Sequence, residues 1–297
     1  MQKITKAVIA AAGFGTRFLP QTKAMPKEML PLIDKPIIQY VVEELVSVGI
    51  EDIVIVTGQN KRSLEDHFDK PNEDLIANLK AGGKSKSGYI EMLNAIGNMA
   101  NFVYIRQKGP YGNGTPLLNA EHIIGNEPFI FTFSDDFIRA TPPRFQQMID
   151  IYNRYQRPVM SVIEVENDDA YDKYGFAGGP EIAEGIIEVN KIVEKPGKKK
   201  APSNLASVSG YLLTPDFFGY LHQSKNNLEP GEELYSNSAL KRMIDDNKRV
   251  IACCIQNGRY FDAGNKLEYL KANIELALED KELRKPLIEF IHKLETN

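Results

Sequence analysis

The chain has 297 residues, of which 42% are hydrophobic and 26% charged, with a formal net charge of −4. This composition is ordinary for a globular protein with a full core, and the slightly acidic balance gives no electrostatic footprint for nucleic acid. No apolar run approaches the roughly 20 residues needed to span a bilayer, so we expect a cytoplasmic protein with no signal peptide and no membrane or nucleic-acid partner.

The first predicted strand, residues 7–11, is a short apolar run that leads into a long loop. In this loop, Gly13 and Gly15 let the backbone approach a phosphate chain and turn its N–H groups toward it. Arg17, Lys23 and Lys27 add positive charge around the same place. Because ligands of α/β sheets sit at the carboxyl ends of strands, the loop predicts a nucleoside triphosphate site.

Spacing excludes two better-known phosphate loops. A dinucleotide fingerprint needs a third glycine where this chain has Phe18, and a P-loop needs Gly-Lys-Ser/Thr where it has residues 15–17. An ordinary tight turn at Gly13 and Gly15 remains the structural alternative. Lys23 is explained equally well as a solvated loop lysine.

The segment 36–48 predicts a helix, because Ile37, Val41 and Leu45 form one apolar stripe between Pro36 and Gly49. Further strands are predicted at residues 53–57, 102–105, 129–133, 159–165, 207–213 and 250–255. A strand–helix–strand order in the first 57 residues indicates right-handed parallel crossover units.

The middle and the end of the chain follow other patterns. Residues 174–180 and 186–193 read as short strands with turns, more antiparallel in character. Residues 266–294 read as two amphipathic helices broken near residues 285–286, which cap the core or form a subunit contact.

An acidic residue at a strand end would suit Mg²⁺, which takes one or two carboxylates together with substrate phosphates. Asp135 follows the apolar strand 129–133 directly, and Asp262 precedes the start of a predicted helix. Asp136 is more simply a supporting or helix-capping residue, and an N-cap role remains the alternative for Asp262.

The loop pattern Gly-x-Gly-Thr-Arg followed by Lys-Ala-x-Pro-Lys-Glu-Met-Leu-Pro-Leu-x-Asp-Lys-Pro resembles the signature of sugar-1-phosphate nucleotidyltransferases, specifically the bacterial UTP–glucose-1-phosphate uridylyltransferases. The resemblance continues through residues 39–44, 106–107, 134–136, 193–196, 202–206 and 262–267. It implies a Rossmann-like α/β nucleotidyltransferase fold, with a mixed, mostly parallel central sheet flanked by helices and a small antiparallel sugar-side subdomain. We expect a single domain over residues 1–297, with a nucleotide half at about 1–140, a sugar half at 141–263 and C-terminal helices at 264–297.

This resemblance implies direct in-line transfer from UTP to α-D-glucose 1-phosphate with Mg²⁺, giving UDP-glucose and pyrophosphate. It implies catalytic roles for Arg17, Lys27 and Asp135, and Mg²⁺ ligation by Asp135 and Asp262. It also implies that Gly175, Glu194 and Lys195 bind the sugar phosphate, although a surface ion pair remains the alternative for Glu194 and Lys195. The residues that it implies for nucleotide binding are Ala12, Gly13, Gly15, Thr16, Glu28, Gln107, Gly112 and Gly114. Of these, Glu28 and Gln107 would contact the uracil base. A homodimer or homotetramer is also implied.

The chain departs from the family pattern at Thr115–Pro116, Ser209–Gly210 and Asn237–Ser238. An arginine and an aspartate are lost on the sugar side, and each loss could remove a charge-assisted hydrogen bond of about 1.5–3 kcal/mol. The exact sugar is therefore open. The alternatives are a sibling transferase for another sugar 1-phosphate, such as N-acetylglucosamine 1-phosphate, or for dTTP, and a non-catalytic nucleotide-sugar sensor.

Overall fold

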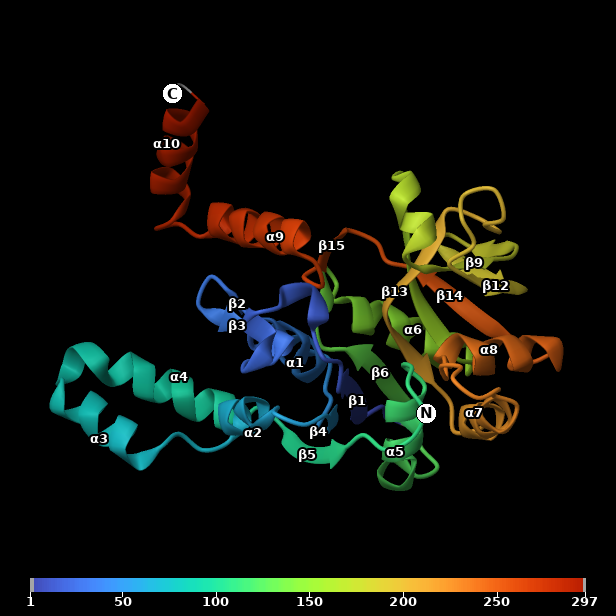
Figure 1. The fold of residues 1–297 in the computed structure, drawn as a ribbon, viewed down its shortest axis with the longest axis horizontal. Helices are drawn as coiled ribbons and strands as arrows, with labels where there is room; N and C mark the ends of the chain where they lie inside the picture. The colour runs from blue at the N-terminus through green and yellow to red at the C-terminus, as the bar shows by residue number, and fades with distance from the viewer. Residues whose placement is uncertain (1–2, 296–297) are drawn as a thin grey trace.

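A mixed sheet runs through the computed structural model, which describes residues 3–295 (Figure 1). The sheet has 11 strands in the described part of the chain, with β9 (Gly175–Gly178) and β12 (Lys191–Glu194) attached beside its main path. In spatial order that path is β10 (Glu181–Ala183), β11 (Ile186–Val189), β14 (Val250–Cys254), β8 (Val159–Glu164), β13 (Leu205–Leu213), β6 (Phe129–Phe133), β1 (Lys6–Ala11), β4 (Asp52–Thr57) and β5 (Asn101–Arg106).

Most strands of the central region point in one direction. β14, β8, β6, β1, β4 and β5 share it, and β13 runs antiparallel between β8 and β6. The predicted mixed, mostly parallel sheet is thereby confirmed. From β1 the chain moves outward to β4 and β5, and it then returns to place β6 on the other side of β1. This change of direction is a topological switch point, where the carboxyl ends of the strands open a crevice for ligands.

Helices cover both faces of the sheet and divide the core in two. Ala7, Ile9 and Ala11 of β1 face one core, whereas Val8 faces the other. Because β1 is buried on both sides, its sequence is nearly continuously apolar. The first core packs against α1 (Ile37–Ser47), α2 (Arg62–Phe68) and α6 (Arg144–Tyr155); the second packs against α5 (Thr115–Ile124), α7 (Phe217–Asn226) and α8 (Ser236–Asp245).

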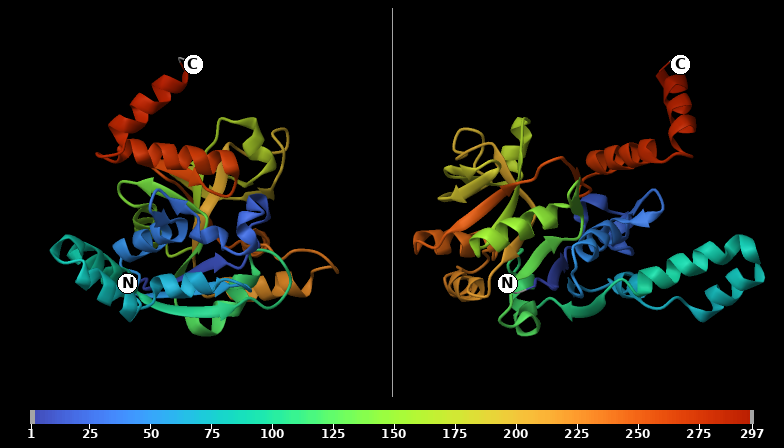
Figure 2. Two further views of the ribbon diagram at one scale, coloured as in Figure 1. Left: turned by 60° about the vertical axis from the view of Figure 1, so that its left-hand side comes forward. Right: turned by 180° about the vertical axis from the view of Figure 1, so that it is seen from behind.

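Two helical segments extend away from the body. The hairpin of α3 (Glu73–Ala81) and α4 (Ser87–Gly97) projects from one end, and α9 (Lys266–Glu279) leads to α10 (Arg284–Glu295), which stands apart from the rest (Figures 1 and 2). No helix within residues 3–295 combines the length and apolar character needed to cross a membrane.

The predicted helix at 36–48 is confirmed as α1, and the two predicted C-terminal helices are confirmed as α9 and α10, but the break between them does not lie at residues 285–286. The chain bends between Glu279 and Arg284 instead, and Pro286 lies in the first turn of α10. Proline is tolerated there because its missing N–H would have no partner within the helix. The short middle strands are antiparallel as predicted, and they join the main sheet through the pairs β9–β13 and β11–β14.

A two-stranded antiparallel ribbon, β7 (Asp136–Ala140) and β15 (Gly258–Asp262), places Asp136 opposite Asp262. A second small sheet pairs β2 (Pro31–Leu32) with β3 (Lys35–Pro36). On the face of the ribbon that packs against α1, Phe137 stacks on Phe261 and on Tyr40 of α1, with ring centroids 5.0 Å apart in each pair.

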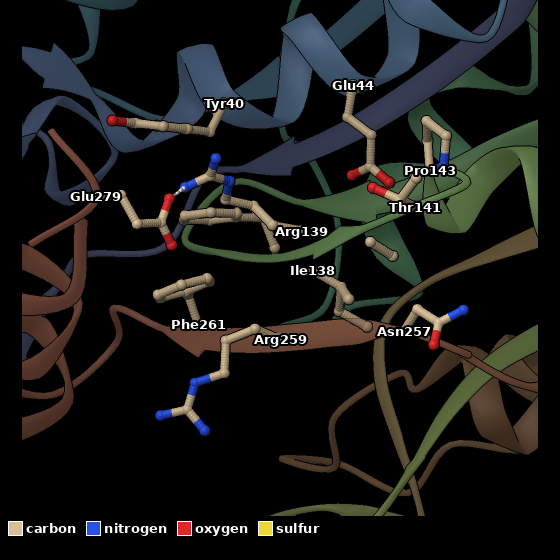
Figure 3. Close-up of a pocket in the computed structure, with 12 residues that line it drawn as sticks. Tyr40, Glu44, Ile138, Arg139, Thr141, Pro143, Asn257, Arg259, Phe261 and Glu279 are labelled. Atoms are coloured by element: carbon tan, nitrogen blue, oxygen red, sulfur yellow. Dashed lines mark hydrogen bonds and ion pairs between the residues drawn. The ribbon is translucent and has the colours of Figure 1, made fainter. Parts of the chain in front are cut away.

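The helix α9 also holds this face of the ribbon. Its Glu279 pairs with Arg139, and its Glu275 Oε1 lies 2.5 Å from Arg259 Nη2. Figure 3 shows the first of these pairs beside a cavity of about 400 Å³ that this face lines. The ribbon that carries Asp262 is therefore supported by a helix from each end of the chain.

Candidate active site

The crevice at the switch point holds a cavity of about 650 Å³, within the size range of small-molecule sites. Its walls come from the loops that leave β1, β4, β5 and β6, four parallel strands whose carboxyl ends lie at one edge of the sheet. The lining includes Ala12, Gly13, Phe14, Lys27, Gly58, Gln59, Gln107, Tyr111, Gly112, Pro116, Phe133 and Asp135.

A second cavity of about 470 Å³ adjoins the first. Phe133 and Asp135 line both, so the two cavities meet at the carboxyl end of β6. The second cavity is lined by charged and hydroxyl-bearing side chains from both halves of the chain, among them Arg17, Asp136, Asp172, Lys173, Tyr174, Lys195, Tyr260 and Asp262.

Arg17, Lys27, Asp135 and Asp262 converge where the cavities meet. A methyl group placed on Gly264 would lie 2.9 Å from Asp262 Oδ1, 3.4 Å from Asp135 Oδ2 and 3.5 Å from Arg17 Nη1. The same Asp135 Oδ2 lies 2.5 Å from Lys27 Nζ. The structure thus brings together two cations and two carboxylates that the sequence separates by up to 245 positions, from Arg17 to Asp262.

The electrostatics of this cluster raise the pKa values of both Lys27 and Asp136. Burial opposes the charge on Lys27, but the carboxylates of Asp135 and Glu28 outweigh it and raise the pKa of Lys27. Burial, together with the charge of Asp135, raises the pKa of Asp136 to about 7. The Tyr260 hydroxyl donates to Asp136 Oδ2 at 3.1 Å, which ties this carboxyl to the ribbon.

Asp135 and Asp262 fit a Mg²⁺ ion in the kind and number of their donors. Both offer hard oxygen ligands, and Mg²⁺ bound by one or two protein carboxylates completes its octahedron with substrate phosphates and water. Within residues 3–295, no group of three or more His, Cys, Asp and Glu side chains forms a metal site, so any ion here would depend on that pair.

The alternative of Asp262 as a helix cap does not match the structure. Asn265 caps α9, since its Oδ1 accepts from Glu268 N at 3.0 Å. Asp262 instead accepts from Gly264 N at 2.8 Å and from the Tyr174 hydroxyl at 3.1 Å. These donors fix the orientation of the Asp262 carboxylate.

The residues expected at the nucleotide separate into two sets. Ala12, Gly13, Gln107 and Gly112 line the first cavity. By contrast, Gly15, Thr16, Glu28 and Gly114 are not part of its lining. Gly15 has a φ of +66° and packs against Thr22 and Lys27, and an added Cβ on Gly114 would lie 2.9 Å from the Leu234 side chain. These two glycines allow close packing of the surrounding loops.

Glu28 does not line the first cavity, although the resemblance implies that it contacts the uracil base. Its side chain has no exposed surface, and both carboxylate oxygens accept from Lys61 Nζ, at 2.7 and 2.6 Å. Lys61 was not identified from the sequence. The available signal was its position in a polar turn shortly after β4, at the same edge of the sheet as Gly13.

On the sugar side, Glu194 and Lys195 point to different neighbours. Lys195 lines the second cavity, whereas Glu194 Oε2 accepts from Asn237 Nδ2 at 3.1 Å. A Cβ on Gly175 would lie 2.8 Å from each of these two atoms, so Gly175 packs directly against them. Asn237 in turn accepts from the Tyr211 hydroxyl at 3.1 Å. The surface ion pair between Glu194 and Lys195 is therefore not what the structure contains.

The other departures from the family pattern lie in packed backbone. A Cβ on Gly210 would lie 2.7 Å from the carbonyl oxygen of Phe131, which leaves no room for a larger residue there. Ser209 accepts from Arg144 Nη1 through its own carbonyl at 2.7 Å. Thr115 is buried and donates to the carbonyl of Pro110 at 2.7 Å.

A switch-point crevice whose two cavities meet at paired cations and carboxylates defines an α/β nucleotidyltransferase. Residues 6–279 match the family model described as nucleotidyl transferase. The UTP–glucose-1-phosphate uridylyltransferase of Staphylococcus epidermidis is 43% identical over 296 residues, covering 99% of this chain and 100% of the relative. The enzyme of that name from Bacillus subtilis is 43% identical over 295 residues, covering 99% of this chain and 98% of the relative.

Solved structures of similar fold point to the same family. A UDP-glucose pyrophosphorylase complexed with UDP-glucose has a TM-score of 0.82 at 38% identity, covering 94% of this chain and 100% of the other. A UTP-bound UGPase from Acinetobacter baumannii has a TM-score of 0.85 at 33% identity, covering 98% and 100%. The chain belongs to the nucleotidyl transferase family, within the bacterial UTP–glucose-1-phosphate uridylyltransferases.

Proposed function

We propose that this protein transfers a uridylyl group from UTP to α-D-glucose 1-phosphate. A phosphate oxygen of the sugar phosphate forms a bond to the α-phosphorus of UTP. The bond from that phosphorus to the oxygen bridging toward the β-phosphorus breaks, and this oxygen leaves with pyrophosphate. The observation that carries the proposal is the meeting of two cavities at Asp135, with Arg17 and Lys27 beside it.

All reacting groups are anionic, so catalysis needs positioning and charge neutralisation more than a nucleophile from the protein. In our proposal, Arg17 and Lys27 hold the triphosphate and stabilise charge that grows at the α-phosphorus. The planar guanidinium fork and the compact ammonium both suit phosphate oxygens. Lys195, which lines the second cavity, would hold the phosphate of the sugar substrate.

We assign the first cavity to the nucleotide and the second to the phosphate of the incoming sugar. The backbone of Ala12 and Gly13 and the side chain of Gln107 would bind the uracil edge, with Gly112 close to the ring. Glu194, oriented by Asn237, would accept hydrogen bonds from sugar hydroxyls. The UTP and UDP-glucose complexes of the related structures support this assignment.

Asp135 and Asp262 would hold Mg²⁺ together with substrate phosphates. A bound divalent ion would neutralise phosphate charge and polarise the α-phosphorus. Tyr174 and the Gly264 amide keep the Asp262 carboxylate in one orientation toward the meeting point of the cavities.

The test is pyrophosphate release from UTP with a panel of sugar 1-phosphates, with and without Mg²⁺. We expect rapid release with glucose 1-phosphate and slower release with N-acetylglucosamine 1-phosphate. Competition between UTP and dTTP tests the base. Well-folded protein that releases no pyrophosphate with any sugar, yet binds UDP-glucose, would be a sensor and not an enzyme.

We further propose that the chain forms a homodimer or homotetramer through its C-terminal helices and acts in the cytoplasm. Large apolar side chains of α9 and α10 are exposed, which is unusual unless a partner covers them. They are Leu267, Leu270, Ile274, Ile288, Phe290 and Leu294. UTP and sugar phosphates are cytoplasmic metabolites, and the free Cys253 and Cys254 suit a reducing compartment.

A further inference from the structure

Lys61 makes a deeply buried ion pair beside the nucleotide cavity, and the proposed chemistry does not use it. Its side chain is 6% exposed and that of Glu28 is fully buried. The ammonium donates to Glu28 Oε1 at 2.7 Å, to Glu28 Oε2 at 2.6 Å and to the carbonyl of Gly13 at 2.8 Å. Lysine has three N–H donors, so all of them are engaged.

This arrangement is costly. Removing an ammonium and a carboxylate from water carries a large desolvation penalty, and apolar residues of similar volume often replace such a pair without loss of stability. Stability alone therefore does not account for the pair. Its placement at the active-site edge of the sheet suggests a positioning role.

The three bonds join the two ends of one long loop to a residue that follows another strand. Gly13 lies near the start and Glu28 near the end of the loop between β1 and β2, next to Lys27, and Lys61 follows β4. On its cavity side, Gly13 packs against Lys27, since an added Cβ would lie 3.7 Å from Lys27 Nζ. Gly13 therefore lies between Lys27, which lines the cavity, and Lys61, which does not.

Residues that follow β4 and β6 also contact the end of β1 and the loop after it. A Cβ on Gly58, at the exit of β4, would lie 3.0 Å from the carbonyl oxygen of Ala12. From the exit of β6, the buried Ser134 hydroxyl donates to the carbonyl of Ala10 at 2.8 Å and lies 3.4 Å from Glu28 Oε1. Lys61 and Glu28 therefore lie at the centre of contacts that set the loops lining the first cavity.

We propose that Lys61 is a positioning residue for the nucleotide: by holding the Gly13 carbonyl and the Glu28 carboxylate, it fixes the position of Gly13 relative to Lys27 within the loop between β1 and β2. The inference rests on the proposed assignment of the first cavity to UTP. Lys61 itself does not line that cavity, so it acts through Gly13 and Lys27 and not by contact with substrate.

The test compares Lys61→Met with Lys6→Met by calorimetric binding of UTP and UDP-glucose. Lys6 is a matched control, because its ammonium also bridges a carboxylate and backbone carbonyls: Glu127 Oε1 at 2.6 Å, Ile123 at 3.2 Å and Ile124 at 3.3 Å. It lies at the opposite end of β1 from Gly13. We expect Lys61→Met to weaken UTP binding at least tenfold and Lys6→Met less than twofold.

A positioning role predicts a selective effect. In steady-state assays of Lys61→Met, the KM for UTP should rise at least tenfold while the KM for the sugar phosphate changes less than threefold. Lys61→Arg keeps the charge and should recover part of the UTP affinity. Equal losses for both substrates, or equal UTP affinities of Lys61→Met and Lys6→Met, would overturn the proposal.

If Lys61→Met does not fold because Glu28 is left as an unpaired buried charge, the double variant Glu28→Gln/Lys61→Met removes both charges. The double variant should recover the unfolding temperature but not UTP affinity, because the Gly13 carbonyl still lacks its donor. Recovery of both would also overturn the proposal. Wild-type protein that binds UTP but releases no pyrophosphate would count against the proposed reaction and leave this comparison intact.

Discussion

Asp135 is the residue on which the proposed chemistry depends most, because among the described residues only its carboxylate lines both cavities and pairs with Lys27. Its position directly after a buried strand makes it easy to find in the sequence. The structural reason for its importance is less visible there, since Arg17, Lys27 and Asp262 reach it from distant parts of the chain.

Replacing Asp135 with asparagine should lower kcat at least 100-fold, corresponding to about 2.7 kcal/mol in the activation free energy, while UTP binding stays within threefold. The amide keeps the shape but loses the charge that would bind the metal ion. Asp168→Asn, which alters an exposed carboxylate paired with Lys198, is the control and should keep full activity. Pyrophosphate release and calorimetry measure both quantities; activity within tenfold of wild type would contradict the assigned role.

Gly112 illustrates a packing constraint that spacing alone does not reveal. It has a φ of +115°, and an added Cβ would lie 2.2 Å from the carbonyl oxygen of Leu234. Gly112→Ala should therefore destabilise the protein by roughly 3 kcal/mol or more, measured by chemical denaturation.

Gly88 is the matched control for this glycine. It lies in the first turn of α4 with nothing within 4 Å of an added Cβ, so Gly88→Ala should leave stability unchanged or raise it by less than about 1 kcal/mol through helix propensity. Destabilisation of similar size in both variants would show that the contact with Leu234 is not the cause.

At the scale of elements, the ribbon β7–β15 depends on α9. Glu275 and Glu279, one turn apart on α9, pair with Arg259 and Arg139 on the two strands. The two arginines lie opposite each other in register, where like charges repel. The glutamates offset this repulsion and hold the strand that ends at Asp262.

The double variant Glu275→Gln/Glu279→Gln should therefore lower stability by about 1 kcal/mol, because the pairs are largely exposed, and lower kcat two- to fivefold with an unchanged UTP affinity. Glu188→Gln breaks the exposed pair with Arg249 elsewhere and serves as the control. Thermal unfolding and steady-state kinetics provide the measurements. An unchanged kcat would mean that α9 does not position Asp262.

Elements of the fold were predictable where local pattern decides them. The apolar run of β1 and the stripe of α1 specify strand and helix without tertiary information. Pro286 and Lys61 show the limit. Local pattern does not say whether a proline ends one helix or begins the next, and only the pairing of β1 with β4 brings Lys61 to Gly13. The position of Asp262 was likewise not predictable from local pattern, because it is the pairing of β15 with β7 that places Asp262 opposite Asp136.

The whole molecule presents an apolar face at its C-terminal end. Leu267, Leu270 and Ile274 recur at helical spacing on α9, and Phe290 of α10 is 57% exposed. Because α10 stands apart from the body (Figure 1), a second copy of the chain is the partner we propose for this face.

Leu270→Glu combined with Phe290→Glu should convert the assembly to a smaller species, measured by sedimentation or light scattering, because a charge in an apolar contact is strongly unfavourable. Leu75→Glu, on the exposed hairpin helix α3, is the comparison. If only the hairpin variant lowers the mass, the subunit contact lies on the hairpin and not on the C-terminal helices.

Among residues 3–295, β15 is the last strand in chain order, and it completes the centre at which the two cavities meet. A nascent chain that stops before this strand can already contain β1, β4 and β6, the framework of the nucleotide crevice. It still lacks Asp262 and the partner that β7 requires. Translation therefore supplies the second carboxylate only after every other strand of the described residues has been made.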